Sequence, residues 1–166
     1  MNSPIILANG AGGLGMATAA RVLLEGRPAL DAVEQGIREI EVDASIRTVG
    51  LGGAPNLLGQ MECDASIMCG KTLRCGAVGA LRDYVHAITV ARQVMERTPH
   101  TMLVGEGAAL FAGEIGEQPI NMLTARARED YQEWLSAQIS FPRMSSDGPH
   151  DNRICGWIRS AARAKI

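Results

Sequence analysis

The sequence predicts one domain of the α+β class. Its 166 residues lie close to the ~150 residues typical of a single domain. Two strand-like segments, residues 60–68 and 73–80, are separated by Gly70-Lys71-Thr72, a composition typical of a hairpin turn. Helical periodicity prevails on both sides of this hairpin, and the N-terminal part has the order strand, helix, helix. Residues 1–166 are therefore expected to form one unit of helices packed on a sheet.

The first third of the chain is predicted to hold one strand and two helices. Residues 3–9 form a short apolar run typical of a buried strand, and a glycine cluster, residues 10–15, follows it. The apolar face of the first helix is predicted to consist of Leu14, Ala17, Ala20 and Leu24. Pro28 opens a second helix. Its apolar face is predicted to consist of Leu30, Val33, Ile37 and Ile40. Residues 48–55 are rich in glycine and predict a tight loop or an irregular strand.

The part after the hairpin is predicted to be mainly helical. A helix with Ile88, Ala91 and Met95 on its inner face ends before Pro99, and residues 101–104 form a short strand. A short helix at 106–115 turns Phe111 inward. The apolar side of a last, longer helix is predicted to hold Leu123, Ala127, Tyr131, Trp134 and Leu135. Residues 141–153 have the composition of a loop.

Composition and charge narrow the classes of partner. The net charge is −2 and the basic residues are scattered, which argues against a nucleic acid or an acidic membrane surface as the partner. The longest apolar run near the start, residues 5–8, is too short for a membrane span or a secretory signal, so a cytoplasmic location is expected. The cysteines make no C-x-x-C pair, and neither a disulfide framework nor a metal site is expected from Cys63, Cys69, Cys75 and Cys155.

The glycine cluster leaves one alternative open. Residues 10–15, Gly-Ala-Gly-Gly-Leu-Gly, fit the G-x-G-x-x-G pattern of dinucleotide-binding loops and lie between a predicted strand and a predicted helix. That fingerprint also requires a second parallel strand directly after the helix, and here a second helix follows instead. The pattern therefore favours a structural role, in which glycine lets the backbone pack closely, and no cofactor is expected.

Seven blocks of the sequence, spread over most of the chain, carry a resemblance to a known family. The blocks are ALDAVEQG at 29–36, VGLGGAPN at 49–56, DASIMCG at 64–70, GAVGAL at 76–81, VARQVMERT at 90–98, HTMLVGEGA at 100–108 and GPHD at 148–151. In this order they resemble the N-terminal-nucleophile (Ntn) asparaginases, and the block at 49–56 leans toward the glycosylasparaginase branch.

This resemblance implies a fold, a reaction and a partner. The family fold is a four-layer αββα sandwich whose two central antiparallel sheets contain strands of two chains, of which this sequence resembles the α-chain. The two chains arise when a precursor cuts itself after an Asp, which frees the amine of the following Thr. The Thr hydroxyl is the nucleophile and its own amine is the base, and an α-amine titrates close enough to neutrality for this role. The implied substrate is an asparagine derivative or an isoaspartyl peptide.

The predicted cleavage site departs from the family pattern. His150 and Asp151 occupy the positions that precede the cut, but Asn152 stands where the nucleophilic Thr belongs. A carboxamide cannot form the ester intermediate that self-cleavage and catalysis require. After Ile158 the resemblance ends, and the second half of the family is not represented in the sequence. We therefore expect a truncated, inactive α-chain portion that needs a β-chain-like partner or associates with itself.

Two smaller departures concern substrate binding. Cys69 stands where the family usually has Asp, and Ala11 stands near the position of a substrate-facing Trp in glycosylasparaginases. Two functional hypotheses therefore remain at this level. The chain is either the α-chain part of an asparaginase-type hydrolase, or a non-catalytic relic or binding module that keeps the same half of the fold.

Overall fold

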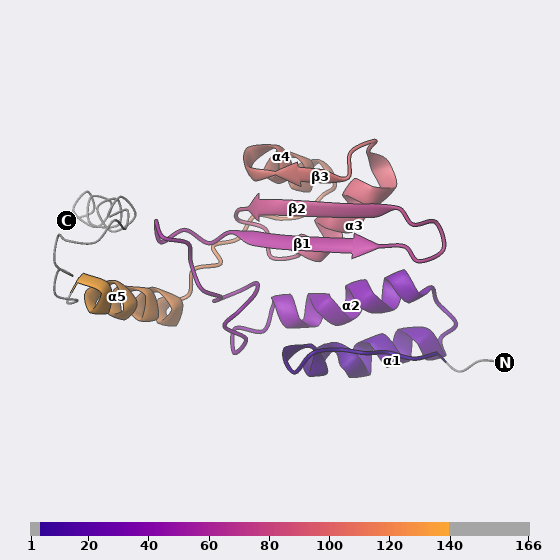
Figure 1. Cartoon of the computed structure of the whole chain (residues 1–166), viewed down its shortest axis with the longest axis horizontal. Coiled ribbons are helices and arrows are strands. Elements are labelled where there is room, and N and C mark those ends of the chain that lie inside the picture. Colours follow the sequence, from indigo (N-terminus) through magenta and orange to yellow (C-terminus); the bar gives the residue numbers. More distant parts are fainter. Residues whose placement is uncertain (1–3, 140–166) are drawn as a thin grey trace, which may run out of the picture.

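The computed structural model describes residues 4–139, so the predicted loop at 141–153 lies outside the described part (Figure 1). The described part contains helices and one three-stranded sheet, which confirms the α+β class. The helices are η1 (Ala11–Gly15, a 3-10 helix), α1 (Met16–Leu24), α2 (Ala29–Glu41), α3 (Ala87–Arg97), α4 (Gly105–Glu114) and α5 (Ala125–Ile139), and the strands are β1 (Cys63–Met68), β2 (Cys75–Leu81) and β3 (Met102–Val104).

The sheet has the order β1-β2-β3 and is mixed. The predicted hairpin is confirmed, since β1 and β2 are antiparallel with Met68 opposite Cys75 and Ile67 opposite Gly76. The expectation of a purely antiparallel sheet is wrong for β3, which runs parallel to β2. Helix α3 carries the chain from the end of β2 back to its start, and such a crossover joins parallel strands.

The N-terminal segment corrects the first sequence prediction. Residues 4–9 form no strand, and Ile5 and Leu7 are 83% and 91% exposed. An extended segment becomes a strand only when a neighbour satisfies its backbone N–H and C=O groups, and in the described part no strand pairs with these residues. Ile6 alone packs inward, against Ala19 and Val22.

The buried face of α1 also differs from the predicted one. Leu14 and Leu24 are exposed, while Ala19 and Val22 are buried. The cause is the close approach of two glycines, because a Cβ on Gly15 would lie 2.1 Å from the carbonyl oxygen of Gly36 in α2. Small residues thus set how α1 rests on α2, and the structural role expected for the glycine cluster is confirmed for Gly15. A dinucleotide-binding loop requires a strand directly before the glycine cluster, and residues 4–9 form no strand.

The main core lies between the sheet and α3. The predicted inner face of α3 is confirmed, since Ile88, Ala91 and Met95 are all at most 4% exposed. The helix lies so close to the sheet that a Cβ on Gly76 of β2 would lie 2.2 Å from the carbonyl oxygen of Ala91. Helix α2 packs on α3 as a further layer, with Leu30 and Ile37 against the core, whereas Val33 of its predicted face is exposed.

The opposite face of the sheet carries no helix in the described part. Met68, Met102 and Val104 lie 52–59% exposed on the strands. Gly79 lies beside two of them, since the nearest neighbours of a Cβ there would be Met102, Val104 and the Asp64 carboxylate. We call this surface the open sheet face. Its large exposed apolar side chains distinguish it from the face that α3 covers.

Candidate functional site

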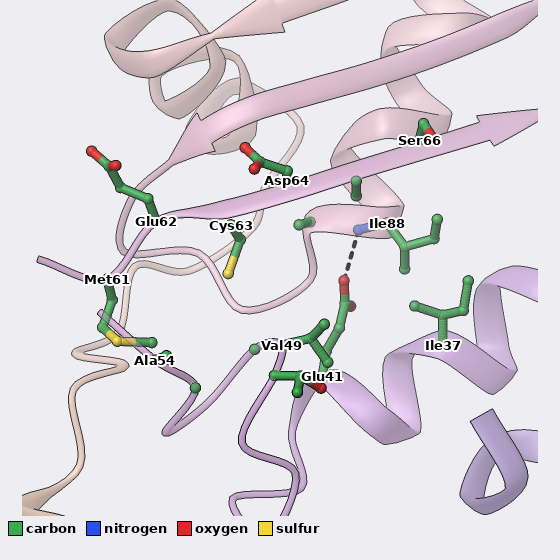
Figure 2. A pocket seen from close by; sticks show the side chains of 15 residues that line it. Ile37, Glu41, Val49, Ala54, Met61, Glu62, Cys63, Asp64, Ser66 and Ile88 are labelled. Atoms are coloured by element: carbon green, nitrogen blue, oxygen red, sulfur yellow. Dashed lines mark hydrogen bonds between the residues drawn. The ribbon is translucent and has the colours of Figure 1, made fainter. Parts of the chain in front are cut away.

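A hollow of about 380 Å³ lies where four segments converge, the end of α2, the glycine-rich loop, β1 and the start of α3 (Figure 2). Its walls combine apolar side chains such as Ile37 and Val49 with the carboxylate of Glu41. Residues 48–55 are rich in glycine, which lets this loop pack directly against the end of α2.

Glu41 is the most buried carboxylate of the described residues and lies in the wall of the hollow. Its Oε1 accepts the backbone N–H of Ile88 at 2.9 Å, and its Oε2 lies 3.4 Å from Nδ1 of His86. An acid at a helix N-terminus satisfies a free N–H and complements the helix dipole. Burial raises the pKa of Glu41 above its ordinary value, although His86 and the Ile88 N–H act in the opposite direction.

The loop that closes the hollow is shaped by a glycine. Gly50 has φ +63°, and a Cβ there would lie 2.1 Å from the carbonyl oxygen of Glu41. The same carbonyl accepts the N–H of Leu51 at 2.7 Å. A side chain at position 50 would be strained both by the backbone conformation and by the contact. Glu41 is thus held through its backbone by the loop and through its side chain by α3.

Cys63 and Asp64 on β1 carry potentially reactive groups, but both have structural roles. Cys63 is buried, and burial raises the pKa of its thiol, which keeps it protonated and a weak nucleophile. Asp64 accepts the N–H of Ala80 at 2.8 Å. Ala80 has φ +51° and belongs to the irregularity in the β1–β2 pairing between Cys63 and Ala65. The carboxylate therefore holds a bulge in β2.

A second charged group joins α2 to α3. The buried Glu34 accepts hydrogen bonds from the Thr89 hydroxyl and from Arg92, both at 2.7 Å, and Arg92 also lies 2.7 Å from Asp31. Burial acts to raise the pKa of Asp31, but hydrogen bonds from Arg92 and Arg27 outweigh it and hold that pKa below its ordinary value. Every charge here has a partner, so we assign the group to helix packing.

Helix α5 is anchored beside the same loop. The Tyr131 hydroxyl donates to the carbonyl oxygen of Leu57 at 3.0 Å, and Ala127 is buried as predicted. A smaller hollow of about 320 Å³ lies between this helix and the loop, with Trp134 and the ion pair of Arg47 with Asp130 in its walls. Trp134, predicted on the apolar side, is 40% exposed.

The residues that the sequence singled out for catalysis, His150, Asp151 and Asn152, lie outside the described residues. Their geometry is therefore not part of the site described above. Sequence reasoning missed Glu41, because an acid in the last turn of an amphipathic helix normally faces solvent. Among residues 4–139, no cluster of three His, Cys, Asp or Glu side chains is arranged to hold a metal ion. No helix in that range has the length and apolar character of a membrane span.

The family model described as asparaginase matches residues 15–153. The chain belongs to the asparaginase family. The resemblance expected from the seven blocks is thereby confirmed.

Relatives of this asparaginase-family chain come from bacteria, animals and archaea. It is 44% identical over 151 residues to an N(4)-(β-N-acetylglucosaminyl)-L-asparaginase of Elizabethkingia miricola, which covers 90% of the chain and 44% of the relative. Identity to the mouse protein of that name is 40% over 134 residues, covering 81% and 39%. A plant-type L-asparaginase of Pyrococcus horikoshii is 45% identical over 105 residues, covering 63% and 34%. The chain thus spans less than half the length of these relatives.

Two of the family blocks, 49–56 and 64–70, contribute residues to the lining of the hollow. Block 49–56 forms the glycine-rich loop, block 64–70 forms most of β1, and block 90–98 lies in α3. Block 29–36 forms the first turns of α2, which lead to Glu41. Asparaginase-like segments therefore line part of the hollow and form the loop and strand beside it, while Glu41 and Ile88 lie outside the blocks.

Proposed function

We propose that this chain is the α-chain part of an asparaginase-type amidohydrolase that cleaves the side-chain amide of an asparagine derivative. The observation that carries the proposal is the family match over residues 15–153. The relatives named for N4-(β-N-acetylglucosaminyl)-L-asparagine support a glycosylated asparagine as the substrate, with free asparagine as the alternative suggested by the archaeal relative.

The proposed enzyme requires a second half. The chain corresponds to 44% of the bacterial relative and 39% of the mouse relative, so more than half of each has no counterpart in it. The open sheet face, with Met68, Met102 and Val104 exposed, is a surface that a second sheet would cover. We infer that a β-chain-like partner packs there and completes a four-layer αββα sandwich.

The proposed division of labour follows from the chemistry. Amide hydrolysis by a covalent route needs a nucleophile beside a base. In residues 4–139, the Cys63 thiol has a raised pKa and Glu41 is committed to the N–H of Ile88. At position 152 the sequence has Asn, which offers no hydroxyl. We therefore propose that the chain alone is inactive and that the partner supplies the nucleophile, while this chain supplies the framework around the hollow.

One observation favours a second candidate function. By the resemblance, Asn152 stands where the family has the residue that it uses for both self-cleavage and catalysis. A chain that keeps the α-half of the fold without that residue fits a non-catalytic relic or binding module. The two candidates predict different outcomes when the missing half is supplied.

The test is an assay for aspartate release from glycosylasparagine, asparagine and an isoaspartyl dipeptide. The purified chain is assayed alone and after mixing with the downstream half of the E. miricola relative, which is also assayed alone. We expect no turnover by either part alone and turnover by the mixture. Turnover by the chain alone that survives Asn152→Ala would contradict the proposed division of labour. A stable mixture without turnover would favour the relic.

A further inference from the structure

The smaller hollow adjoins the candidate site and has no part in the function proposed above. It has a volume of about 320 Å³ and lies between α5 and the glycine-rich loop. Gly53 and Ala54 lie in the walls of both hollows, so only two small residues separate the two spaces. The volume falls in the range of about 300–1,000 Å³ that is usual for small-molecule sites. A ligand bound in the larger hollow therefore has the smaller one within reach.

Two aromatic side chains of α5 form an ordered wall of the smaller hollow. The rings of Tyr131 and Trp134 are stacked, with centroids 6.3 Å apart and an interplanar angle of 24°. Tyr131 is fixed by its hydrogen bond to the carbonyl of Leu57 and by close packing on Gly59, where a Cβ would lie 2.9 Å from Cε1 of the ring. Trp134 is nevertheless 40% exposed. Side chains that are ordered before binding lose little entropy on binding, so this wall is suited to hold an apolar surface.

A charged pair lies beside the aromatic wall. Arg47 and Asp130 form an ion pair whose side chains are 42% and 38% exposed. Among the described residues, they are the only charged ones that line this hollow. Because the two charges compensate, the hollow selects neither an anion nor a cation. The guanidinium still offers N–H donors and the carboxylate still offers lone pairs to a neutral ligand.

A neutral ligand with an apolar face and a hydroxylated rim matches both parts of the wall. The pyranose ring of a sugar has this form, since its C–H groups pack on an aromatic ring while its hydroxyls donate to a carboxylate and accept from a guanidinium. An apolar peptide side chain would desolvate the charged pair and give it no new partner, which is unfavourable. Free asparagine has no apolar face to cover the Trp134 ring.

We propose that the smaller hollow is a subsite for a pyranose, with Trp134 as the stacking surface and Arg47 and Asp130 as the partners of its hydroxyls. The proposal rests on the proposed function, because it takes the sugar to belong to a glycosylated asparagine whose amide lies in the larger hollow. Such a substrate passes over Gly53 and Ala54, which have no long side chain to block its path. This chain thus contributes specificity for the glycosylated substrate while the partner supplies the nucleophile.

The first experiment is a titration of the whole chain with N-acetylglucosamine and with chitobiose, its disaccharide, followed by tryptophan fluorescence. The chain has two tryptophans, so Trp157→Phe leaves Trp134 as the only reporter. We expect a saturable change in its emission, with a dissociation constant below about 10 mM for chitobiose. Asparagine and acetamide, which have an amide but no ring, are the control ligands and should cause no change.

Variants locate the sugar through saturation-transfer NMR, which detects the bound ligand and needs no tryptophan. Trp134→Ala should weaken binding at least about tenfold, and Trp134→Phe should restore part of the affinity because it keeps a ring. Glu133→Ala is the matched control, since Glu133 is exposed on the same helix and does not line the hollow. A thermal melt of each variant establishes that it folds.

The reconstituted enzyme tests the subsite independently. In the mixture with the downstream half of the E. miricola relative, Trp134→Ala should raise KM for glycosylasparagine at least about fivefold. It should leave KM for asparagine and the kcat for both substrates unchanged, because the sugar is bound equally well before and during the reaction.

The outcomes separate the subsite from the function. Saturable binding that depends on Trp134 supports the subsite, and a mixture without hydrolysis then refutes the function alone. Hydrolysis in which Trp134→Ala leaves KM for glycosylasparagine unchanged overturns the subsite and leaves the function standing. The subsite is also overturned by the absence of sugar binding, by binding that survives Trp134→Ala, or by an equal response to acetamide.

Discussion

The carboxylate of Glu41, the last residue of α2, accepts the backbone N–H of Ile88 in the first turn of α3 at 2.9 Å. Two helices separated by the loop and the hairpin are thereby joined at one buried point beside the hollow. The contact makes Glu41 a part of the framework and not a free acid. Its protonation should therefore be visible in the stability of the chain.

Glu41→Gln should change how stability depends on pH. Burial raises the folded-state pKa of Glu41 above 4.5, so the folded state favours the protonated form. The free energy of unfolding of the parent should therefore exceed that of the variant by the largest margin below pH 4.5. This margin should shrink as the pH rises through the folded-state pKa of Glu41. Thermal melts of both proteins between about pH 4 and 8 measure the difference. An advantage that grows with pH would contradict the assignment.

Glu34→Ala should destabilise the chain strongly. It removes the acceptor for Thr89 and leaves Arg92 half-buried with fewer partners, which is expected to cost about 3 kcal/mol. Urea unfolding measures this loss. The matched control is Arg21→Ala, which breaks the exposed ion pair with Glu25 and should cost less than about 0.5 kcal/mol. Equal effects of the two substitutions would show that the buried group is not a structural contact.

Gly76→Ala should separate α3 from the sheet. The added Cβ would lie 2.2 Å from the Ala91 carbonyl oxygen and 2.6 Å from the Met95 nitrogen, and neither backbone atom can move alone. We expect a loss of at least about 2 kcal/mol in the free energy of unfolding. Gly70→Ala is the control, since nothing lies within 4 Å of its Cβ, and it should leave the midpoint of unfolding almost unchanged. A Gly76→Ala protein as stable as the control would disprove the close packing.

The chain alone should self-associate through the open sheet face. Met102 and Val104 are 52% and 59% exposed there, and exposed apolar surface favours association. The double substitution Met102→Lys and Val104→Lys should shift the sedimentation profile toward the monomer. Leu24→Lys, on α1 and 85% exposed to solvent, should not. A parent chain that sediments as a monodisperse monomer and melts cooperatively would show that this face needs no cover.

The sequence was most informative where structure depends on local patterns. The hairpin of β1 and β2 was predicted because Gly70-Lys71-Thr72 separates two strand-like runs, and α3 because its inner residues recur at helical spacing before Pro99. The glycine-rich loop was also predictable from local composition. Glycine adopts positive φ readily, and Gly50 and Gly52 both have positive φ. The family, too, was recognisable from blocks whose residues lie in these elements.

Only the tertiary structure decided which surfaces meet. Residues 4–9 have the composition of a strand but no neighbour to pair with in the described part, and the Gly15–Gly36 contact leaves Leu14 and Leu24 outside the interface with α2. The parallel pairing of β3 depends on the path of α3, and the role of Glu41 depends on where the start of that helix lies. Pairing, close approach and burial join residues far apart in the chain, and no local spacing encodes them. The sequence by itself determined the hairpin, most of the helices and the family, while the packing of α2, β1 and α3 decided where the hollow lies and which strand edge faces it.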